Sequence, residues 1–194
     1  MKRYYIAILL FYVSLLLSVN GNDFDNGSEY NVVIEELRLT YYAGVEDEEY
    51  IDSLQSILIK KFGEDTAKYS PIALAYQAGL NALKSKHAFW PFTKMTFLNE
   101  SMDVFSEAVE RDSTNLEIRF MRFSILYYVP GILGYNEEEE SDMNAVYGLL
   151  LEKDFSKINF NLQEGMAQFL IRSELLTFEQ ESKLSNRFML AKNE

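Results

Sequence analysis

The sequence predicts an all-α protein, built as a stack of antiparallel helical hairpins with about eight helices after a signal peptide. Apolar residues recur at helical spacing along most of the 194 residues. The chain has only three Pro and nine Gly, too few for a loop-rich all-β fold. Capping residues and stop signals divide the apolar pattern into segments of ordinary helix length.

The N-terminus has the pattern of a secretory signal peptide. Lys2 and Arg3 precede an apolar run over residues 4–17, and small residues end the segment at Gly21. The run is shorter than the roughly 20 apolar residues that a membrane-spanning helix needs. We therefore predict a signal peptide over residues 1–21, a flexible leader over 22–28 and a single all-α helical domain over 29–194.

Composition restricts the compartment and the partners. The chain has no cysteine, and 18 Lys and Arg against 30 Asp and Glu give it a formal net charge of −12. So acidic a protein is expected to repel nucleic acid and anionic membrane surfaces, because phosphate binding depends on a basic face. The lack of cysteine and the signal segment indicate a bacterial exported protein, periplasmic or extracellular. Membrane association is expected only if the N-terminal segment is uncleaved.

Two helices are predicted before the centre of the chain. The first runs from about residue 29 to 43, with Gly44 as its stop. The second begins with the acidic residues 47–49 and ends with Lys60 and Lys61 before Gly63. Acidic residues at the start and basic residues at the end both suit the helix dipole.

The densest apolar pattern spans residues 69–135 and predicts three more helices. Ser70 is a good N-cap for the first of them, and Pro71 is tolerated at the first helical position. Small residues line one face of this helix, which predicts the close approach of another helix. They are Ala75, Ala78, Gly79 and Ala82.

The next helix is predicted over residues 92–111. Thr114 and Glu117 then form the pattern of a capping box, in which each side chain bonds the backbone N–H of the other residue. The helix that they open ends before Pro130. The apolar residues 132–135 are predicted to pack back on the core.

Three helices are predicted in the last third of the chain. Four consecutive glutamates, residues 137–140, open the first. Asn161 and Glu164 resemble an N-cap pair for the second, and Thr177 and Gln180 form a capping box for the third. No segment has a convincing strand pattern.

The central helices resemble a degenerate tetratricopeptide (TPR) repeat and the start of a second. The resemblance rests on Ala78-Gly79 and Ala82 in the first helix, on Ser101, Phe105 and Ala108 in the second, and on the turn over residues 112–117. Between Ala82 and Ser101 the chain has about ten residues more than the repeat allows. The resemblance covers roughly residues 70–130 and implies a stack of α-hairpins and a role in protein interaction.

The sequence has no catalytic motif and predicts no enzyme activity, metal or cofactor. His87 is the only histidine, and Gly-x-Ser-x-Gly, P-loop, His-Glu-x-x-His and EF-hand patterns are all missing. Residues 137–140 with Asp142 offer the oxygen ligands that Ca²⁺ prefers. Consecutive helical positions point around the axis, however, so these side chains are expected to form a solvated helix N-terminus.

Arg119 and Arg122 are the candidate binding residues. They stand at i and i+3 within an apolar segment, so they share one helix face. Their guanidinium groups either pair with carboxylates of the chain itself or grip an acidic side chain or C-terminal carboxylate of a partner. The aromatic residues that either line the same surface or belong to the core are Trp90, Tyr127, Tyr128 and Tyr135.

These patterns together favour an exported, non-enzymatic protein-interaction or scaffold module of TPR-like architecture. Its partner would be a protein or peptide whose identity the sequence does not specify. One alternative is a small helical ligand-binding protein or enzyme with a pocket near Trp90, Arg119 and Arg122. Another is an adaptor that an uncleaved N-terminal segment anchors to a membrane complex.

Overall fold

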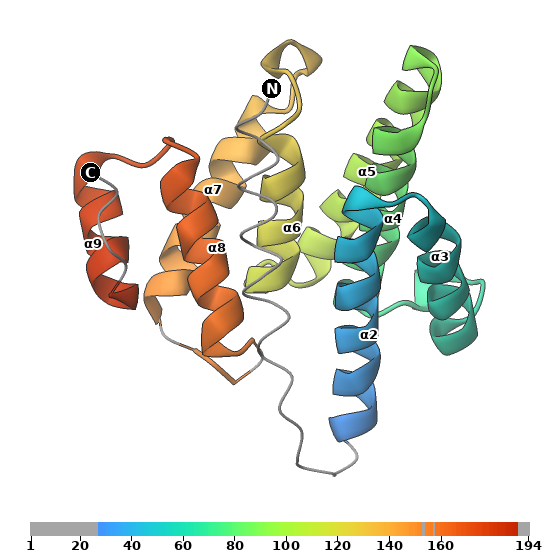
Figure 1. Ribbon diagram of the computed structural model, residues 1–194, viewed down its shortest axis with the longest axis horizontal. Helices are drawn as coiled ribbons and strands as arrows, with labels where there is room; N and C mark the ends of the chain where they lie inside the picture. The colour runs from blue at the N-terminus through green and yellow to red at the C-terminus, as the bar shows by residue number, and fades with distance from the viewer. Residues whose placement is uncertain (1–26, 153, 157, 190–194) are drawn as a thin grey trace. The chain divides into compact units, whose positions relative to one another are not determined.

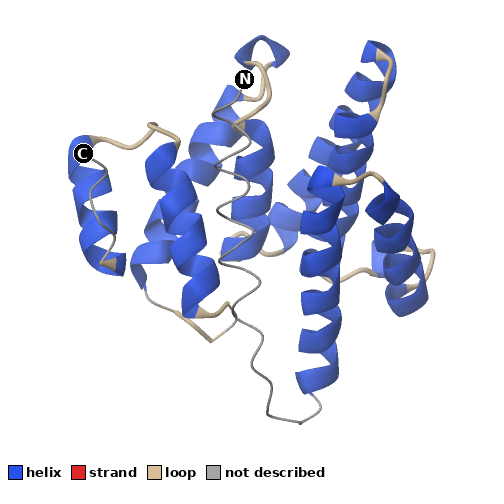
Figure 2. Cartoon of the chain, in the orientation of Figure 1, coloured by secondary structure: helices blue, strands red, loops and turns tan. Residues whose placement is uncertain are grey.

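The computed structural model describes residues 27–152, 154–156 and 158–189, and it is helical throughout this part of the chain (Figure 1, Figure 2). These residues form eight α-helices, α2 to α9, with two short 3-10 helices and no strand. The predicted all-α class is confirmed. Residues 1–26, which include the predicted signal peptide, lie outside the described residues. None of the described helices is long and apolar enough to cross a bilayer.

The described residues group into two compact units. The N-terminal unit, described from residue 27 to 125, holds α2 (Gly27–Glu46), α3 (Glu49–Phe62), η1 (Thr66–Lys68), α4 (Pro71–His87), α5 (Pro91–Arg111) and all but the last residue of α6 (Leu116–Leu126). The C-terminal unit begins at Leu126 and holds η2 (Gly131–Leu133), α7 (Asn136–Glu152), α8 (Phe160–Arg172) and α9 (Phe178–Phe188). The single domain over residues 29–194 stays a prediction.

Helix α2 is longer at both ends than the sequence predicted. It continues through Gly44, which is buried and is not a helix stop. A Cβ atom at this position would lie 2.7 Å from Leu83 Cδ1 of α4. Glycine is therefore used here for close helix packing, which the local sequence cannot distinguish from a C-terminal stop. On this helix Val32 is exposed, while Leu37 and Tyr41 are buried.

Helix α3 follows its prediction closely. Glu49 and Asp52 lie in its first turn, and Lys60 and Lys61 lie in its last. The helix ends at Gly63, whose φ of 86° is in the region that favours glycine.

Helix α4 is the central element of the N-terminal unit. The Ser70 hydroxyl accepts a backbone N–H of the first turn and Pro71 follows it, as predicted. The helix packs against α2, α3 and α5. At Gly79 a Cβ atom would lie 2.8 Å from the Tyr41 ring of α2 and 3.1 Å from Met121 Cε of α6. Helices α2 and α6 therefore both pack against the predicted face of small residues, at the position of Gly79.

Helix α5 lies antiparallel to α4 and completes a hairpin with it (Figure 1). Its buried stripe contains the predicted residues Leu98, Met102, Phe105, Ala108 and Val109. Ser101, which takes the place of Ala in the TPR-like pattern, is also fully buried. Its Oγ donates to Ala78 O at 2.8 Å, so the buried hydroxyl has a partner.

Helix α6 is capped by Asn115 and not by the predicted Thr114. Asn115 Oδ1 accepts the backbone N–H groups of Glu117 and Ile118 at 3.2 and 3.3 Å. The Glu117 side chain makes no capping box, because it is used in a buried contact with α2. The prediction of a Thr114–Glu117 capping box is therefore wrong.

Glu117 and Arg38 form a buried bidentate ion pair between α6 and α2. Arg38 Nε lies 2.7 Å from Glu117 Oε1, and Arg38 Nη2 lies 2.8 Å from Glu117 Oε2. Each side chain is only 8% exposed. The Tyr76 hydroxyl of α4 donates to Glu117 Oε1 at 2.6 Å, and Glu35 also accepts from Arg38. One carboxylate thus joins α2, α4 and α6.

The ionisation of these groups follows from their burial. Desolvation raises the pKa of the Tyr76 phenol well above its ordinary value, and the negative charge of Glu117 raises it further. Desolvation lowers the pKa of Arg38, but its hydrogen bond to Glu117 and the charge of that carboxylate more than offset this effect. Tyr76 therefore remains a neutral donor, while Arg38 remains a cation.

In the C-terminal unit, α7, α8 and α9 each pack against the other two. Asn159, and not the predicted Asn161, caps α8, since its Oδ1 accepts the Leu162 N–H at 3.0 Å. The capping box of Thr177 and Gln180 is confirmed at the start of α9.

Two side chains differ from expectation. Ile132 in η2 is almost fully exposed and does not pack back on the core. Asp142, expected at a solvated helix start, is fully buried in α7. The spacing of apolar residues indicates which face of a helix is buried. It does not show how far the neighbouring helices extend along that face.

The close approach at Gly79 predicts opposite effects for two glycine-to-alanine substitutions. Gly79→Ala should lower the free energy of unfolding by about 1–3 kcal/mol, because the added methyl meets the buried Tyr41 ring. The control is Gly148→Ala in α7, where no atom lies within 4 Å of the added Cβ. It should raise the free energy by roughly 0.5–1 kcal/mol through helix propensity alone. Urea denaturation followed by circular dichroism measures both, and stabilisation by both would contradict the close approach.

The ion pair predicts that removing the Arg38 cation alone is worse than removing both charges. Arg38→Met alone should lower the free energy of unfolding by about 3–5 kcal/mol, because the Glu117 carboxylate is then buried without its cation. Glu117→Gln alone should cost less, because Arg38 keeps its ion pair with Glu35. The double variant should be less destabilised than Arg38→Met, and its Gln can still accept from Tyr76. A double-variant effect equal to the sum of the two single effects would show that the charges are independent.

Candidate functional site

The sequence-predicted site residues are divided between the two units. Trp90, Arg119 and Arg122 lie in the N-terminal unit, and Tyr127, Tyr128 and Tyr135 lie in the C-terminal unit. A binding surface shared by all six therefore stays a prediction.

Arg119 and Arg122 have different surroundings although they are one turn apart on α6. Arg119 is partly exposed, and its Nε donates to Ser113 O at 2.9 Å. Arg122 is buried, and its Nη1 lies 3.4 Å from Ser106 Oγ of α5. Arg119 thus supports the turn before α6, while Arg122 contributes to the contact between α5 and α6.

The predicted tyrosines contact α8. The ring centroids of Tyr127 and Tyr128 lie 5.5 and 6.4 Å from that of Phe169, and 5.0 Å from each other. Tyr128 remains exposed on one side, and Tyr135, just before α7, is half-buried. These rings are therefore partly used in the packing of their own unit.

His87 is the last residue of α4. Its Nε2 lies 2.9 Å from Gly44 O, so the imidazole connects the end of α4 to α2. No group of three His, Asp or Glu side chains in the described part of the chain could hold a metal ion.

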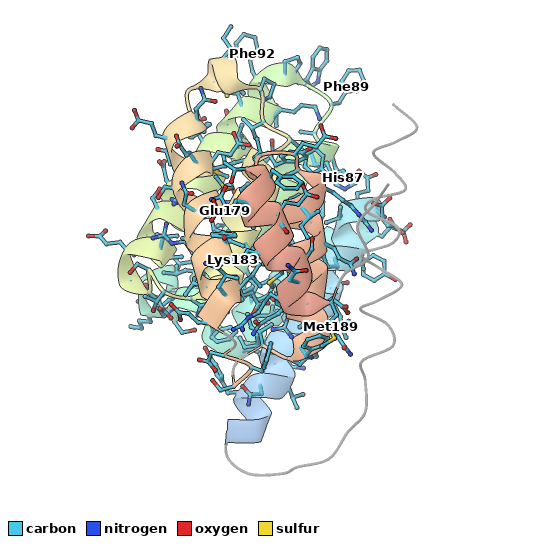
Figure 3. All side chains as sticks on the ribbon, turned by 90° about the vertical axis from the view of Figure 1, so that its left-hand side faces the viewer. His87, Phe89, Phe92, Glu179, Lys183 and Met189 are labelled. Carbon is cyan, nitrogen blue, oxygen red and sulfur yellow. The ribbon has the colours of Figure 1, made fainter. Side chains whose placement is uncertain are left out.

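The most exposed aromatic group in the N-terminal unit is the turn between α4 and α5, which we call the aromatic tip. It consists of Phe89, Trp90, Pro91 and Phe92, and the three aromatic side chains are 83%, 67% and 91% exposed. Figure 3 shows Phe89 and Phe92 at the free end of the hairpin, with His87 closer to α2. A cluster of adjacent exposed aromatic side chains is typical of an interaction surface, whereas a single one is ordinary.

The segment between Ala82 and Ser101 contains this tip. Within it, α4 continues to His87 and α5 starts at Pro91. The joined ends of α4 and α5 reach beyond the adjoining ends of α2 and α3 (Figure 1). No neighbouring helix of this unit therefore covers the aromatic side chains.

Hydrogen bonds hold the two helices together directly below the tip. Ser85 Oγ donates to Lys94 O at 2.8 Å, and Lys94 Nζ donates to Lys86 O at 2.7 Å and Ser85 O at 3.3 Å. Lys86 and His87 also bond backbone carbonyl groups near the end of α2. Carbonyl groups in the last turn of a helix have no partner within that helix, and here Lys94 provides one. These bonds fix α4 and α5 to each other and to α2, and we call this region directly below the tip its braced base.

The segment that forms the tip carries positive charge, although the chain as a whole is acidic. The sequence has no Asp or Glu between Asp65 and Glu100, its longest stretch without a carboxylate. The cations within this stretch nearest the tip are Lys84, Lys86 and Lys94. Partial burial lowers the pKa of Lys86, and the negative charge of Glu46 opposes this effect. An acidic segment, residues 46–49, thus begins beside Lys86 in the last turn of α4.

Sequence reasoning identified Trp90 as a candidate but assigned no role to its two aromatic neighbours. Phe89 and Phe92 were recognisable only as part of an aromatic loop, because periodicity does not show whether a loop is covered by another element. The available signal was the combination of three large aromatic residues beside a proline with a stretch that has no carboxylate.

No family model matches this chain, and no similar protein was found among curated proteins or solved structures. The TPR-like pattern thus stays a resemblance. The function has to be argued from the residues of the site.

The bracing below the tip predicts that Lys94→Met loosens the tip while the helices remain folded. Loss of the ammonium leaves two carbonyl groups at the end of α4 without this donor, so Trp90 should gain rotational freedom. Trp90 is the only tryptophan, so its fluorescence anisotropy reports the tip directly and should fall. Lys183→Met, at an exposed lysine of α9, is the matched control. Equal anisotropy in both variants and the wild type would show that Lys94 does not brace the tip.

Proposed function

We propose that this chain is an exported, non-enzymatic interaction module that docks to its partner through the aromatic tip. The observation that carries the proposal is the joint exposure of Phe89, Trp90 and Phe92 on a braced turn. Aromatic side chains are frequent anchors of binding surfaces, because they bury a large area and lose little conformational freedom.

The braced base supports this role. Docking costs less free energy when the binding element is already ordered, since fewer side chains and backbone angles must be fixed on association. The bonds of Ser85 and Lys94 join the two helices, and the bond of His87 connects them to α2. The TPR-like pattern of α4 and α5 supports the same function, because α-hairpins of that family act as interaction modules.

The tip is a better docking element than Arg119 and Arg122. Arg122 is buried against α5, and Arg119 is held by the turn before α6. The buried cluster of Arg38, Tyr76 and Glu117 also favours a structural role, since its groups bind one another. The tip, by contrast, exposes apolar area that the N-terminal unit itself does not use.

Photo-crosslinking from the tip tests this function in cells. Benzoylphenylalanine placed at position 89 should form adducts, while the same group at position 178, where Phe178 is 80% exposed in the C-terminal unit, should not. Trp90→Ser with Phe92→Ser should reduce the adduct yield at position 89 at least about tenfold, as expected when anchor residues are removed. Electrophoresis and mass spectrometry measure the yield. Equal yields at the two positions, or no effect of the serine substitutions, would overturn the proposal.

A further inference from the structure

We propose that the aromatic tip inserts into the interfacial region of a phospholipid bilayer that contains anionic lipids. This inference rests on the proposed docking function and names its partner. The size of the tip, the chemistry of its side chains and the local charge favour this partner over a protein.

The apolar area of the tip is small for a protein interface. An aromatic side chain buries about 150–250 Å². Phe89, Trp90 and Phe92 together therefore offer less than the roughly 800 Å² that each partner contributes to a stable protein complex. The tip is also convex, since it is the end of a helical hairpin (Figure 1). A bilayer interface accepts a convex apolar element without a matching pocket, so the tip needs no further contact area there.

The order of the side chains suits the polarity gradient of a bilayer interface. Phe89 and Phe92 are the most exposed residues of the tip and have no polar group. Trp90 lies between them in sequence and carries an indole N–H that prefers the headgroup level. Insertion of the two Phe rings toward the acyl chains leaves the indole where its N–H can be hydrogen-bonded.

The charges near the tip suit an anionic surface. Lys84, Lys86 and Lys94 lie on the last turn of α4 and the first turn of α5, and no carboxylate occurs from residue 66 to 99. Cations just behind an apolar anchor strengthen its binding to anionic lipid. Glu46 lies near Lys86, so the acidic segment at residues 46–49 offsets part of this positive charge and would resist a closer approach. The hairpin is therefore expected to enter by its end and not to lie flat.

Trp90 is a local probe for this inference, because the chain has no other tryptophan. The full chain is titrated with vesicles of phosphatidylcholine mixed with phosphatidylglycerol. Trp90 emission should shift to shorter wavelength, and lipids brominated at the upper acyl carbons should quench it. The affinity should be lower for vesicles of pure phosphatidylcholine. The difference in affinity between the two vesicle compositions should become smaller at high salt, because salt screens the charges.

Two variants with Trp90 retained separate tip insertion from binding elsewhere. Phe89→Ser with Phe92→Ser should weaken the vesicle affinity reported by Trp90 at least about tenfold, because the inserted rings are lost. Phe178→Ser removes an equally exposed Phe from the C-terminal unit and should leave this affinity unchanged. Circular dichroism checks that each variant keeps the helical content of the wild type.

The outcomes distinguish this inference from the proposed function. An unchanged Trp90 spectrum with every vesicle, or an equal affinity of the Phe89→Ser, Phe92→Ser variant, overturns membrane insertion. Equal affinity for pure phosphatidylcholine and for its mixture with phosphatidylglycerol overturns the proposed preference for an anionic surface. If crosslinking from position 89 then captures one protein in a tip-dependent manner, the docking function stands with a protein partner. Absence of both vesicle binding and crosslinks overturns the two proposals together.

Discussion

The N-terminal unit depends on a single buried carboxylate. Glu117 of α6 receives two hydrogen bonds from Arg38 of α2 and one from Tyr76 of α4. Burial of a charge is costly unless it is paired and hydrogen-bonded, so helix positions that separate these groups are strongly disfavoured. The ion pair thus selects one arrangement of α2, α4 and α6. Gly79 makes that arrangement possible, because it lets Tyr41 and Met121 approach the α4 backbone.

The same arrangement determines where the hairpin of α4 and α5 ends relative to α2. Gly44 brings α2 close to Leu83, and its carbonyl oxygen lies beside the His87 imidazole. Beyond that level the hairpin continues without a neighbour from its own unit, and the aromatic residues of the tip remain in solvent (Figure 3). The packing below the tip therefore creates both its rigidity and its exposure. Phe89 and Phe92 are largely exposed and so contribute little to the core of this unit, which is why we connect them with binding.

Charge is distributed unevenly along this acidic chain. The net charge of −12 suggests repulsion from anionic surfaces, yet the carboxylates are missing from residues 66–99. Screening limits the reach of exposed charges to about 10 Å at moderate salt, so carboxylates farther away than this have little effect at the tip, whereas Glu46 acts on Lys86. Net charge alone thus argues against extended electrostatic binding, as expected for nucleic acid, but not against a contact confined to the hairpin end.

The sequence by itself determined the features that depend on neighbouring residues along the chain. The helical class, the caps at Ser70 and Thr177 and the end of α3 at Gly63 all follow from interactions within one or two turns. The tertiary structure decided what depends on residues far apart. Glu117 has the spacing of a capping box, but Arg38 lies 79 positions away and binds it. Gly44 has the position of a stop but serves close packing with α4. Exposure of the tip was undetermined for the same reason, since burial depends on which distant helices reach a residue.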